Sequence, residues 1–141
     1  MDLKASGKTI SLNGFPHAEE IGMEMTPTGD GEVLVTVPYA EKLVGDAETG
    51  VVHGGVITTI LDTGCGIAAI AKTGKMGGIA TLDLRIDYMR PAKPGETLKA
   101  ACECYRVTRS VAFARGVAYD ADPDDPVATA AGAFMLTGGD E

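Results

Sequence analysis

One stretch of the chain, residues 50–71, constrains the fold most strongly. Within it, residues 56–71 are apolar or small except for four polar side chains, Thr58, Thr59, Asp62 and Thr63. A run of this length exceeds an ordinary strand, so it predicts a helix. The polar residues form two pairs with four-residue spacing, which places them on one narrow stripe of a helix that is otherwise apolar. Such a helix is expected to be buried by the elements that wrap around it.

The start of this predicted helix is rich in glycine. In the segment His53-Gly54-Gly55, the two glycines have no side chains to shield the first backbone N–H groups. A helix leaves these groups without internal partners, and they carry partial positive charge. The segment therefore predicts a site for an anion or for an oxygen that becomes charged during a reaction. A glycine-rich helix start needed for close packing is the alternative.

Asp62 is the second unusual feature of the helix. Aspartate is a poor helix former and is costly to bury unless it is paired, so carboxylates in such positions are often functional. The alternatives are an aspartate bonded to a neighbouring backbone or hydroxyl group, or one that faces water. Asp62 follows Gly54 by eight residues, or about 12 Å along a helix. If both act on one substrate atom, they must come from different chains, which predicts a two-fold dimer with two interface sites.

The composition indicates one globular domain. The chain has 141 residues, of which 45% are hydrophobic and 23% are charged, and this length suffices for a core of its own. The net charge is −8, and no block of Lys and Arg residues is present. Nucleic acid is therefore not expected as a partner, because phosphate binding requires clustered positive charge.

The cysteine and hydropathy patterns favour a reduced, cytoplasmic protein. Cys65, Cys102 and Cys104 show no disulfide pattern and are expected to be reduced and buried. No Cys/His spacing resembles a zinc site, so no metal is expected. Residues 1–14 lack a signal-peptide core. The central apolar run is shorter than the roughly 20 residues of a membrane span and contains Asp62, so no membrane partner is expected.

The rest of the chain predicts a hairpin before the helix and four strands after it. Residues 21–25 and 32–37 flank a turn that contains Pro, Gly and Asp. Alternating apolar and polar residues predict the later strands, at 80–88, 98–104, 111–119 and 127–136. No helix separates these four, so we expect them to pair antiparallel and to curl around the helix. The mostly polar residues 1–14 are expected to form a loosely ordered arm.

Several of these segments together resemble one known family. The string Val52-His53-Gly54-Gly55 is followed by Asp62, by residues 81–92 (Thr-Leu-Asp-Leu-Arg-Ile-Asp-Tyr-Met-Arg-Pro-Ala) and by Pro94-Gly95-Glu96. This pattern resembles the hotdog-fold acyl-CoA thioesterases of the phenylacetate-pathway (PaaI-type) group. The resemblance implies an α+β hotdog fold over residues 15–141, with an antiparallel sheet wrapped around one long central helix. It also implies a homodimer or homotetramer with sites at the dimer interface.

The resemblance implies roles for the residues at the predicted site. The backbone N–H of Gly54 would polarise the thioester carbonyl, and Asp62 of the opposite subunit would be the nucleophile or general base. His53 would help to place the carbonyl region of the substrate, with Gly55 beside it as a substrate-binding residue. Thr81 would help to orient the attacking water.

Further candidates concern substrate binding. Many relatives carry Asn six residues before the histidine, where this chain has Ala47, and the adjacent Glu48 is the candidate to act in its place. Arg90, Lys93 and Arg109 lie in predicted turns and are candidates for binding the phosphates of coenzyme A. No cofactor is expected, because coenzyme A is part of the substrate.

The predicted function is hydrolysis of an acyl-CoA thioester to a free acid and CoA, with water activation and an acyl-enzyme both open as routes. A non-catalytic acyl-CoA or lipid-binding protein of the same fold is the alternative, but it would not need Asp62. A hotdog hydratase would pair its carboxylate with a histidine further along the chain, and none follows Asp62. A structural or assembly role predicts no ligand. The acyl group is left open among aromatic, short-chain and medium-chain groups.

Overall fold

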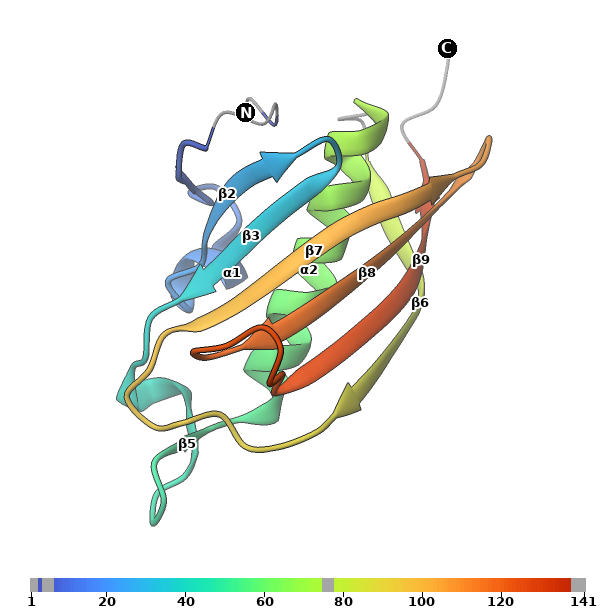
Figure 1. Ribbon diagram of the computed structural model, residues 1–141. Helices are drawn as coiled ribbons and strands as arrows, with labels where there is room; N and C mark the ends of the chain where they lie inside the picture. The colour runs from blue at the N-terminus through green and yellow to red at the C-terminus, as the bar shows by residue number, and fades with distance from the viewer. Residues whose placement is uncertain (1–2, 4–6, 75–77, 138–141) are drawn as a thin grey trace.

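One long helix lies in the hollow of a curved antiparallel sheet (Figure 1). The computed structural model describes residues 3, 7–74 and 78–137. Its elements in chain order are β1 (Ile10–Ser11), α1 (Pro16–Glu20), β2 (Glu24–Gly29), β3 (Glu32–Val37), the 3-10 helix η1 (Glu41–Leu43), β4 (Val44–Asp46), β5 (Val51–Val52), α2 (Gly54–Thr73), β6 (Ile79–Tyr88), β7 (Leu98–Val107), β8 (Val111–Tyr119) and β9 (Ala128–Leu136). The expected α+β arrangement of a sheet around a central helix is confirmed.

The main sheet has seven strands in the order β1-β2-β3-β7-β8-β9-β6, and every neighbouring pair is antiparallel. The predicted antiparallel pairing of the four later strands is thus confirmed. However, β6 pairs with β9 and not with β7, which follows it in the chain. The connection after β6 contains Pro91, Pro94 and Gly95, which disfavour a tight hairpin. It crosses the lower end of the molecule in Figure 1 and leaves β6 at the edge of the sheet.

The first hairpin differs from its prediction in one strand. The strand predicted at residues 21–25 is observed as β2, Glu24–Gly29, and α1 precedes it. The turn is shorter than predicted, because β2 continues to Gly29 and β3 begins at Glu32. Gly31 in this turn adopts a φ of 68°, a conformation that glycine accommodates without strain. Pro27 is tolerated inside β2 because the pairing with β3 is irregular between Pro27 and Gly29, where a ladder hydrogen bond can be omitted.

Two glycines allow α2 to lie close to the sheet. A Cβ atom added at Gly64 would lie 2.6 Å from Sγ of Cys102 in β7, and one added at Gly116 in β8 would lie 3.0 Å from Cδ2 of Leu61. A side chain at either position would therefore push the helix away from the strands. The three cysteines are free and buried, as predicted. α2 is long and apolar enough to span a membrane, but it is the core helix and half of it is buried in the fold.

The first residues of the chain contact the domain at several described points, among them a hydrogen bond from the Gly7 N–H to the Pro27 carbonyl. Ile10 and Ser11 pair with β2, and Leu12 is buried. Residues 1–2 and 4–6 lie outside the described part of the chain. That residues 1–14 form a loosely ordered arm, and that the domain proper begins at residue 15, therefore stays a prediction.

Gly64→Ala is expected to lower the free energy of unfolding by about 1–3 kcal/mol, because overpacking displaces α2 from β7. Gly66→Ala is the matched control in the same helix. There the added Cβ would be 3.8 Å from the Phe134 ring, an ordinary contact, and alanine favours the helix. Urea denaturation of both variants measures the difference. Equal stabilities would contradict close packing at Gly64.

Candidate active site

The start of α2 presents a single unpaired backbone donor. His53 is the N-cap residue, and its Nδ1 accepts a 2.8 Å hydrogen bond from the N–H of Gly55. In neutral His53 this bond places the ring proton on Nε2. Among the described residues, none accepts a hydrogen bond from the N–H of Gly54. Of the two predicted glycine donors, Gly54 is therefore open to a ligand, whereas Gly55 is occupied by the cap.

Tyr88 forms one wall beside this donor. A Cβ atom at Gly54 would lie 3.8 Å from the Tyr88 ring, so the last residue of β6 borders the first residue of α2. The Tyr88 and Thr58 hydroxyl groups are hydrogen-bonded to each other, and the Thr58 hydroxyl also donates to the Gly54 carbonyl. Tyr88 was not predicted to be a site residue. Its place in the family-like segment 81–92 was the available signal, but its contact with α2 depends on the tertiary fold.

The second polar centre joins α2 to the edge strand. The Thr81 hydroxyl donates a 2.8 Å hydrogen bond to Oδ1 of Asp62. Asp62 is half-buried, and no other donor among the described residues bonds to its carboxylate. The carboxylate is therefore held by one oxygen while Oδ2 can bind water or a substrate atom. Two of the predicted site residues, Asp62 and Thr81, therefore lie in direct contact, whereas the predicted role of Thr81 in orienting water stays a prediction.

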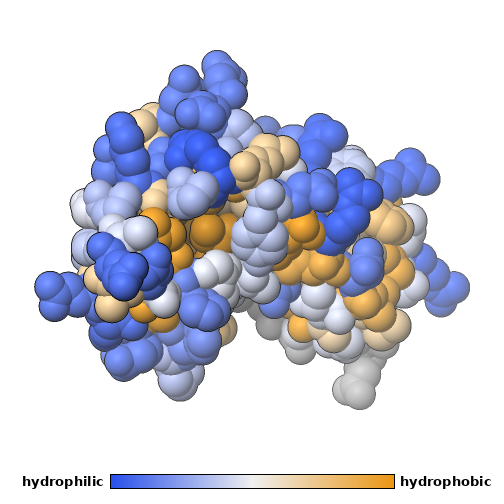
Figure 2. All heavy atoms as spheres, turned by 90° about the horizontal axis from the view of Figure 1, so that it is seen from below, coloured by the Kyte–Doolittle hydropathy of each residue, from blue (hydrophilic) through white to orange (hydrophobic). Residues whose placement is uncertain are grey.

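Two neighbouring cavities extend from this centre. The near cavity, of about 220 Å³, is bordered by Asp62 and Thr81 together with apolar side chains. The far cavity, of about 320 Å³, is bordered by Leu3 and Leu12 from the N-terminal segment. Figure 2, which shows the face at the end where α2 begins, has hydrophobic atoms gathered in its hollowed middle and polar atoms around them. The near cavity beside Asp62 is itself lined largely by apolar residues.

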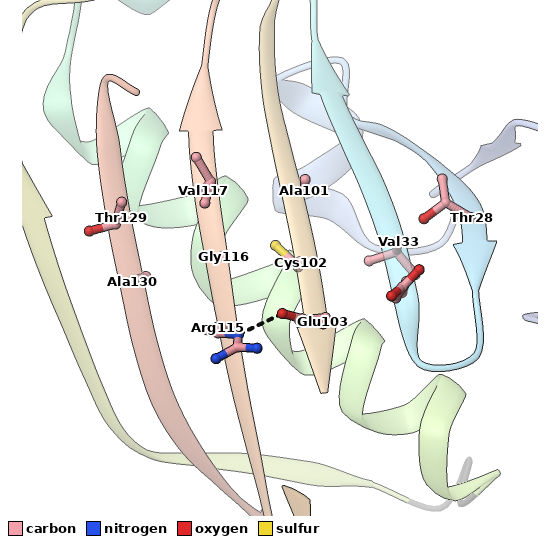
Figure 3. A pocket seen from close by; sticks show the side chains of 11 residues that line it. Thr28, Val33, Ala101, Cys102, Glu103, Arg115, Gly116, Val117, Thr129 and Ala130 are labelled. Atoms are coloured by element: carbon pink, nitrogen blue, oxygen red, sulfur yellow. Dashed lines mark hydrogen bonds and ion pairs between the residues drawn. The ribbon is translucent and has the colours of Figure 1, made fainter. Parts of the chain in front are cut away.

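A further hollow, of about 470 Å³, lies on the face of the sheet turned away from α2 (Figure 3). It contains an ion pair between Arg115 and Glu103, with Nε and Oε1 2.5 Å apart. None of the site residues predicted from the sequence borders it. The charges of Arg115 and Glu103 neutralise each other. The hollow is not bordered by Asp62 and is separate from the centre described above.

Arg90 has a structural role that differs from the predicted one. All three nitrogens of its guanidinium group donate within the loops: two hydrogen bonds, of 2.9 and 2.8 Å, go to the Asp120 carboxylate, and the others go to Pro91 and Asp125. Asp120 is only 3% exposed. The Arg90 guanidinium holds the pKa of this carboxyl well below its usual range. Because all of these donors are bonded within the loops, the Arg90 guanidinium is not available to bind a phosphate group.

The remaining predicted substrate-binding residues are dispersed. The Lys93 side chain is exposed in the loop after β6, where its backbone N–H donates to Asp120. Glu48 lies exposed in the β4–β5 turn, with its N–H bonded to Asp46. Arg109 lies in the β7–β8 turn, at the end of the sheet opposite the start of α2 (Figure 1). Of Lys93, Glu48 and Arg109, the first two lie at the end of the molecule where α2 begins, and Arg109 lies at the other end.

No group of three or more His, Cys, Asp or Glu side chains that could hold a metal ion is found in the described part of the chain. The chemistry that the arrangement itself offers is a carboxylate with one open oxygen, a hydroxyl that orients it, and a backbone donor at a helix start. These are the groups that acyl transfer from a carbonyl compound uses.

Comparison with known proteins identifies the family. The model of the thioesterase superfamily matches residues 49–127, which is more than half of the chain and includes α2, β6, β7 and β8. The chain belongs to the thioesterase superfamily. The family that the sequence resembles is thereby confirmed.

Individual relatives agree with this membership. The medium/long-chain acyl-CoA thioesterase YigI of Escherichia coli is 27% identical over 114 residues, covering 72% of this chain and 73% of YigI. A candidate esterase of Halobacterium salinarum is 39% identical over 77 residues, or 52% of this chain, and the match spans half of that relative's length.

Solved structures share the fold over most of the chain. A Pseudomonas aeruginosa protein is 43% identical, with a TM-score of 0.79 and coverage of 88% of this chain and 92% of that one. The Escherichia coli PaaI protein from the phenylacetic acid degradation operon is 19% identical, with a TM-score of 0.76 and coverage of 88% and 86%. The hotdog arrangement of a thioesterase is therefore confirmed for this chain.

Asp120→Ala is expected to lower the free energy of unfolding by about 2–3 kcal/mol, because a buried carboxylate with several donors is lost. Since the pKa of Asp120 is lowered in the folded state, its contribution is complete above the unfolded pKa of about 3.9 and is lost only as the pH falls towards the folded value. Denaturation at pH 7 and in acid measures this. Asp124→Ala, an exposed change in the same turn, is the control; equal effects would contradict the assigned role.

Proposed function

We propose that this protein hydrolyses acyl-CoA thioesters to a free acid and coenzyme A. The observation that carries the proposal is the Asp62 carboxylate, bonded through Oδ1 to Thr81 and open at Oδ2, at the border of an apolar cavity. A carboxylate in this position can activate water or attack a carbonyl. An apolar cavity beside it suits an acyl group. The likeness to YigI, which is named an acyl-CoA thioesterase, supports this substrate class.

The active protein is proposed to be a two-fold dimer. Gly54 and Asp62 lie eight residues apart on α2, about 12 Å along its axis, so one chain does not bring both to one carbonyl carbon. β6 is an edge strand with Leu82 52% exposed, and such an edge is a ready pairing surface for another strand. Two-fold pairing there would turn the two α2 helices antiparallel and create two equivalent sites. Assembly of dimers into a tetramer remains part of the proposal.

The proposed reaction assigns each polar group one task. The Gly54 N–H of one subunit donates to the thioester carbonyl oxygen and stabilises the negative charge that develops on it. Asp62 of the opposite subunit either takes a proton from water, which then attacks the carbonyl carbon, or attacks that carbon itself. The C–S bond breaks, and the thiolate of coenzyme A leaves and takes up a proton. In the route of direct attack, water then hydrolyses the mixed anhydride formed with Asp62, which releases the acid and restores the carboxylate. Thr81 holds Asp62 through Oδ1, and the His53 Nε2–H lies on the same helix start to help position the substrate.

Lys93 is the remaining loop cation proposed to meet the phosphates of coenzyme A, because its side chain is exposed near the start of α2. Arg109 would have to reach the phosphates from another subunit. Glu48, in the β4–β5 turn, is proposed instead to act in place of the Asn that many relatives carry. The proposed location is the cytoplasm, because the three cysteines are free and reduced cysteines are typical of that compartment. Non-catalytic acyl-CoA binding is the alternative, and it gives no reason for a carboxylate oriented by Thr81.

Gly54→Pro tests the backbone donor with little change of structure. The variant removes the N–H, and proline is favoured at the first position of a helix. The preceding His53 has φ −57° and ψ 135°, which a residue before proline tolerates. We expect kcat to fall by about a hundredfold or more. Gly54→Ala keeps the N–H and is the control; an equal loss in both variants would contradict the assigned donor.

Asp62→Asn is expected to reduce thiol release from acyl-CoA to near the background rate while the dimer persists.

Mixing Asp62→Asn chains with Gly54→Pro chains should then restore roughly a quarter of the wild-type activity. About half of the randomly formed dimers are mixed, and each mixed dimer has one intact site of two. Thiol release after subunit exchange measures this. No recovery would show that both groups act within one chain, and full activity of Asp62→Asn would sink the mechanism.

A further inference from the structure

The near and far cavities lie side by side against the same stretch of α2 and have a common wall. Five residues border both cavities: Phe15, Thr63, Ile67, Ile70 and Ile79. Asp62 and Thr81 border only the near cavity, whereas Leu3 and Leu12 border only the far one. An acyl group attached to a carbonyl at Asp62 would therefore enter the near cavity first. The far cavity lies beyond the common wall.

We propose that Phe15 sets the length of the acyl group that the enzyme accepts. This inference rests on the proposed thioesterase function. The other four shared residues belong to α2 or β6, which are fixed by the core and the sheet. Phe15 alone comes from the N-terminal side, just before α1. Its side chain therefore borders both cavities from outside α2 and β6, and in this proposal it limits the passage of an acyl chain from the near cavity to the far one.

The backbone at Phe15 is held while its ring is open to solvent. Its N–H donates to the Leu12 carbonyl at 3.2 Å, and its carbonyl accepts from the Glu19 N–H at 2.9 Å. His17 of α1 reaches α2, with Nε2 3.3 Å from Oγ1 of Thr59. Phe15 itself is 55% exposed. The ring can therefore be changed in size without removing a core contact, and its position above α2 is set by α1.

The dimensions indicate a medium-chain acyl group. The α2 wall from Asp62 to Ile70 is about 12 Å long, at 1.5 Å of rise per residue. Each C–C bond of about 1.5 Å advances an extended alkyl chain by about 1.25 Å, so this wall matches about ten carbons. Longer chains must pass Phe15 into the far cavity. The side chains along the wall are chiefly Ile and Phe, which favour an aliphatic chain through apolar burial.

The test is the acyl-chain profile of kcat/KM, measured by thiol release with hexanoyl-, decanoyl- and tetradecanoyl-CoA. Phe15→Ala is expected to raise the ratio of tetradecanoyl to hexanoyl turnover by about tenfold or more, because a hydrophobic pocket discriminates by about that factor for small changes in size. Phe15→Trp is expected to lower the ratio of decanoyl to hexanoyl turnover. Tyr105→Ala is the matched control: Tyr105 is 49% exposed and its ring lies against Arg115, away from α2.

The outcomes separate the two proposals. If wild type hydrolyses none of the three thioesters, nor phenylacetyl- or benzoyl-CoA, the proposed function is overturned and, with it, the role of Phe15. Hydrolysis by wild type with unchanged ratios in the folded Phe15 variants would overturn the role of Phe15 alone. Phe15→Leu replaces the ring with a smaller apolar side chain. If Phe15→Ala does not fold, the same substrate ratios are measured with Phe15→Leu. A parallel change of ratio in Tyr105→Ala would also contradict a local effect of Phe15.

Discussion

The close packing of α2 against the sheet is the contact on which the rest of the structure depends. Gly64 of α2 lies against Cys102 of β7, and Gly116 of β8 lies against Leu61 of α2, so neither position leaves room for a Cβ atom between the helix and the sheet. The sheet covers only one side of the helix. The stripe with Thr58 and Asp62 meets the edge strand β6 through hydrogen bonds, to Tyr88 and Thr81, and it can therefore hold polar groups without loss of core packing. Rigid burial of one face gives the other face a defined geometry.

The same packing explains which features could be predicted from the sequence. The helix, the later strands, and the polar stripe follow from periodicity, which is a local property of the chain. The free donor at Gly54 follows from the glycines at the helix start. The hydrogen bond between Thr81 and Asp62 was not predicted. The family resemblance named both as site residues, but only the fold brings β6 to the middle of α2.

Other features depend on contacts between distant segments and gave no local signal. Three such features result from the tertiary fold: the Tyr88 ring beside Gly54, the pairing of β6 with β9, and the exposed ring of Phe15.

Arg90 is a case in which the local signal was misleading. Its position in a basic turn favoured phosphate binding, but the guanidinium is fully used by Asp120 and Asp125. A charged residue in a loop cannot be assigned to a ligand until its neighbours in the fold are known.

The place of β6 at the edge of the sheet has a consequence for the order of folding. Its partner within the chain is β9, which comes after both β7 and β8 in the sequence. Pairing that is distant in sequence forms slowly, because a long loop must close first. During synthesis, β6 cannot pair with β9 until β9 has left the ribosome, whereas β2 and β3 can pair earlier. The strand that orients Asp62 is therefore the last part of the sheet to gain its partner.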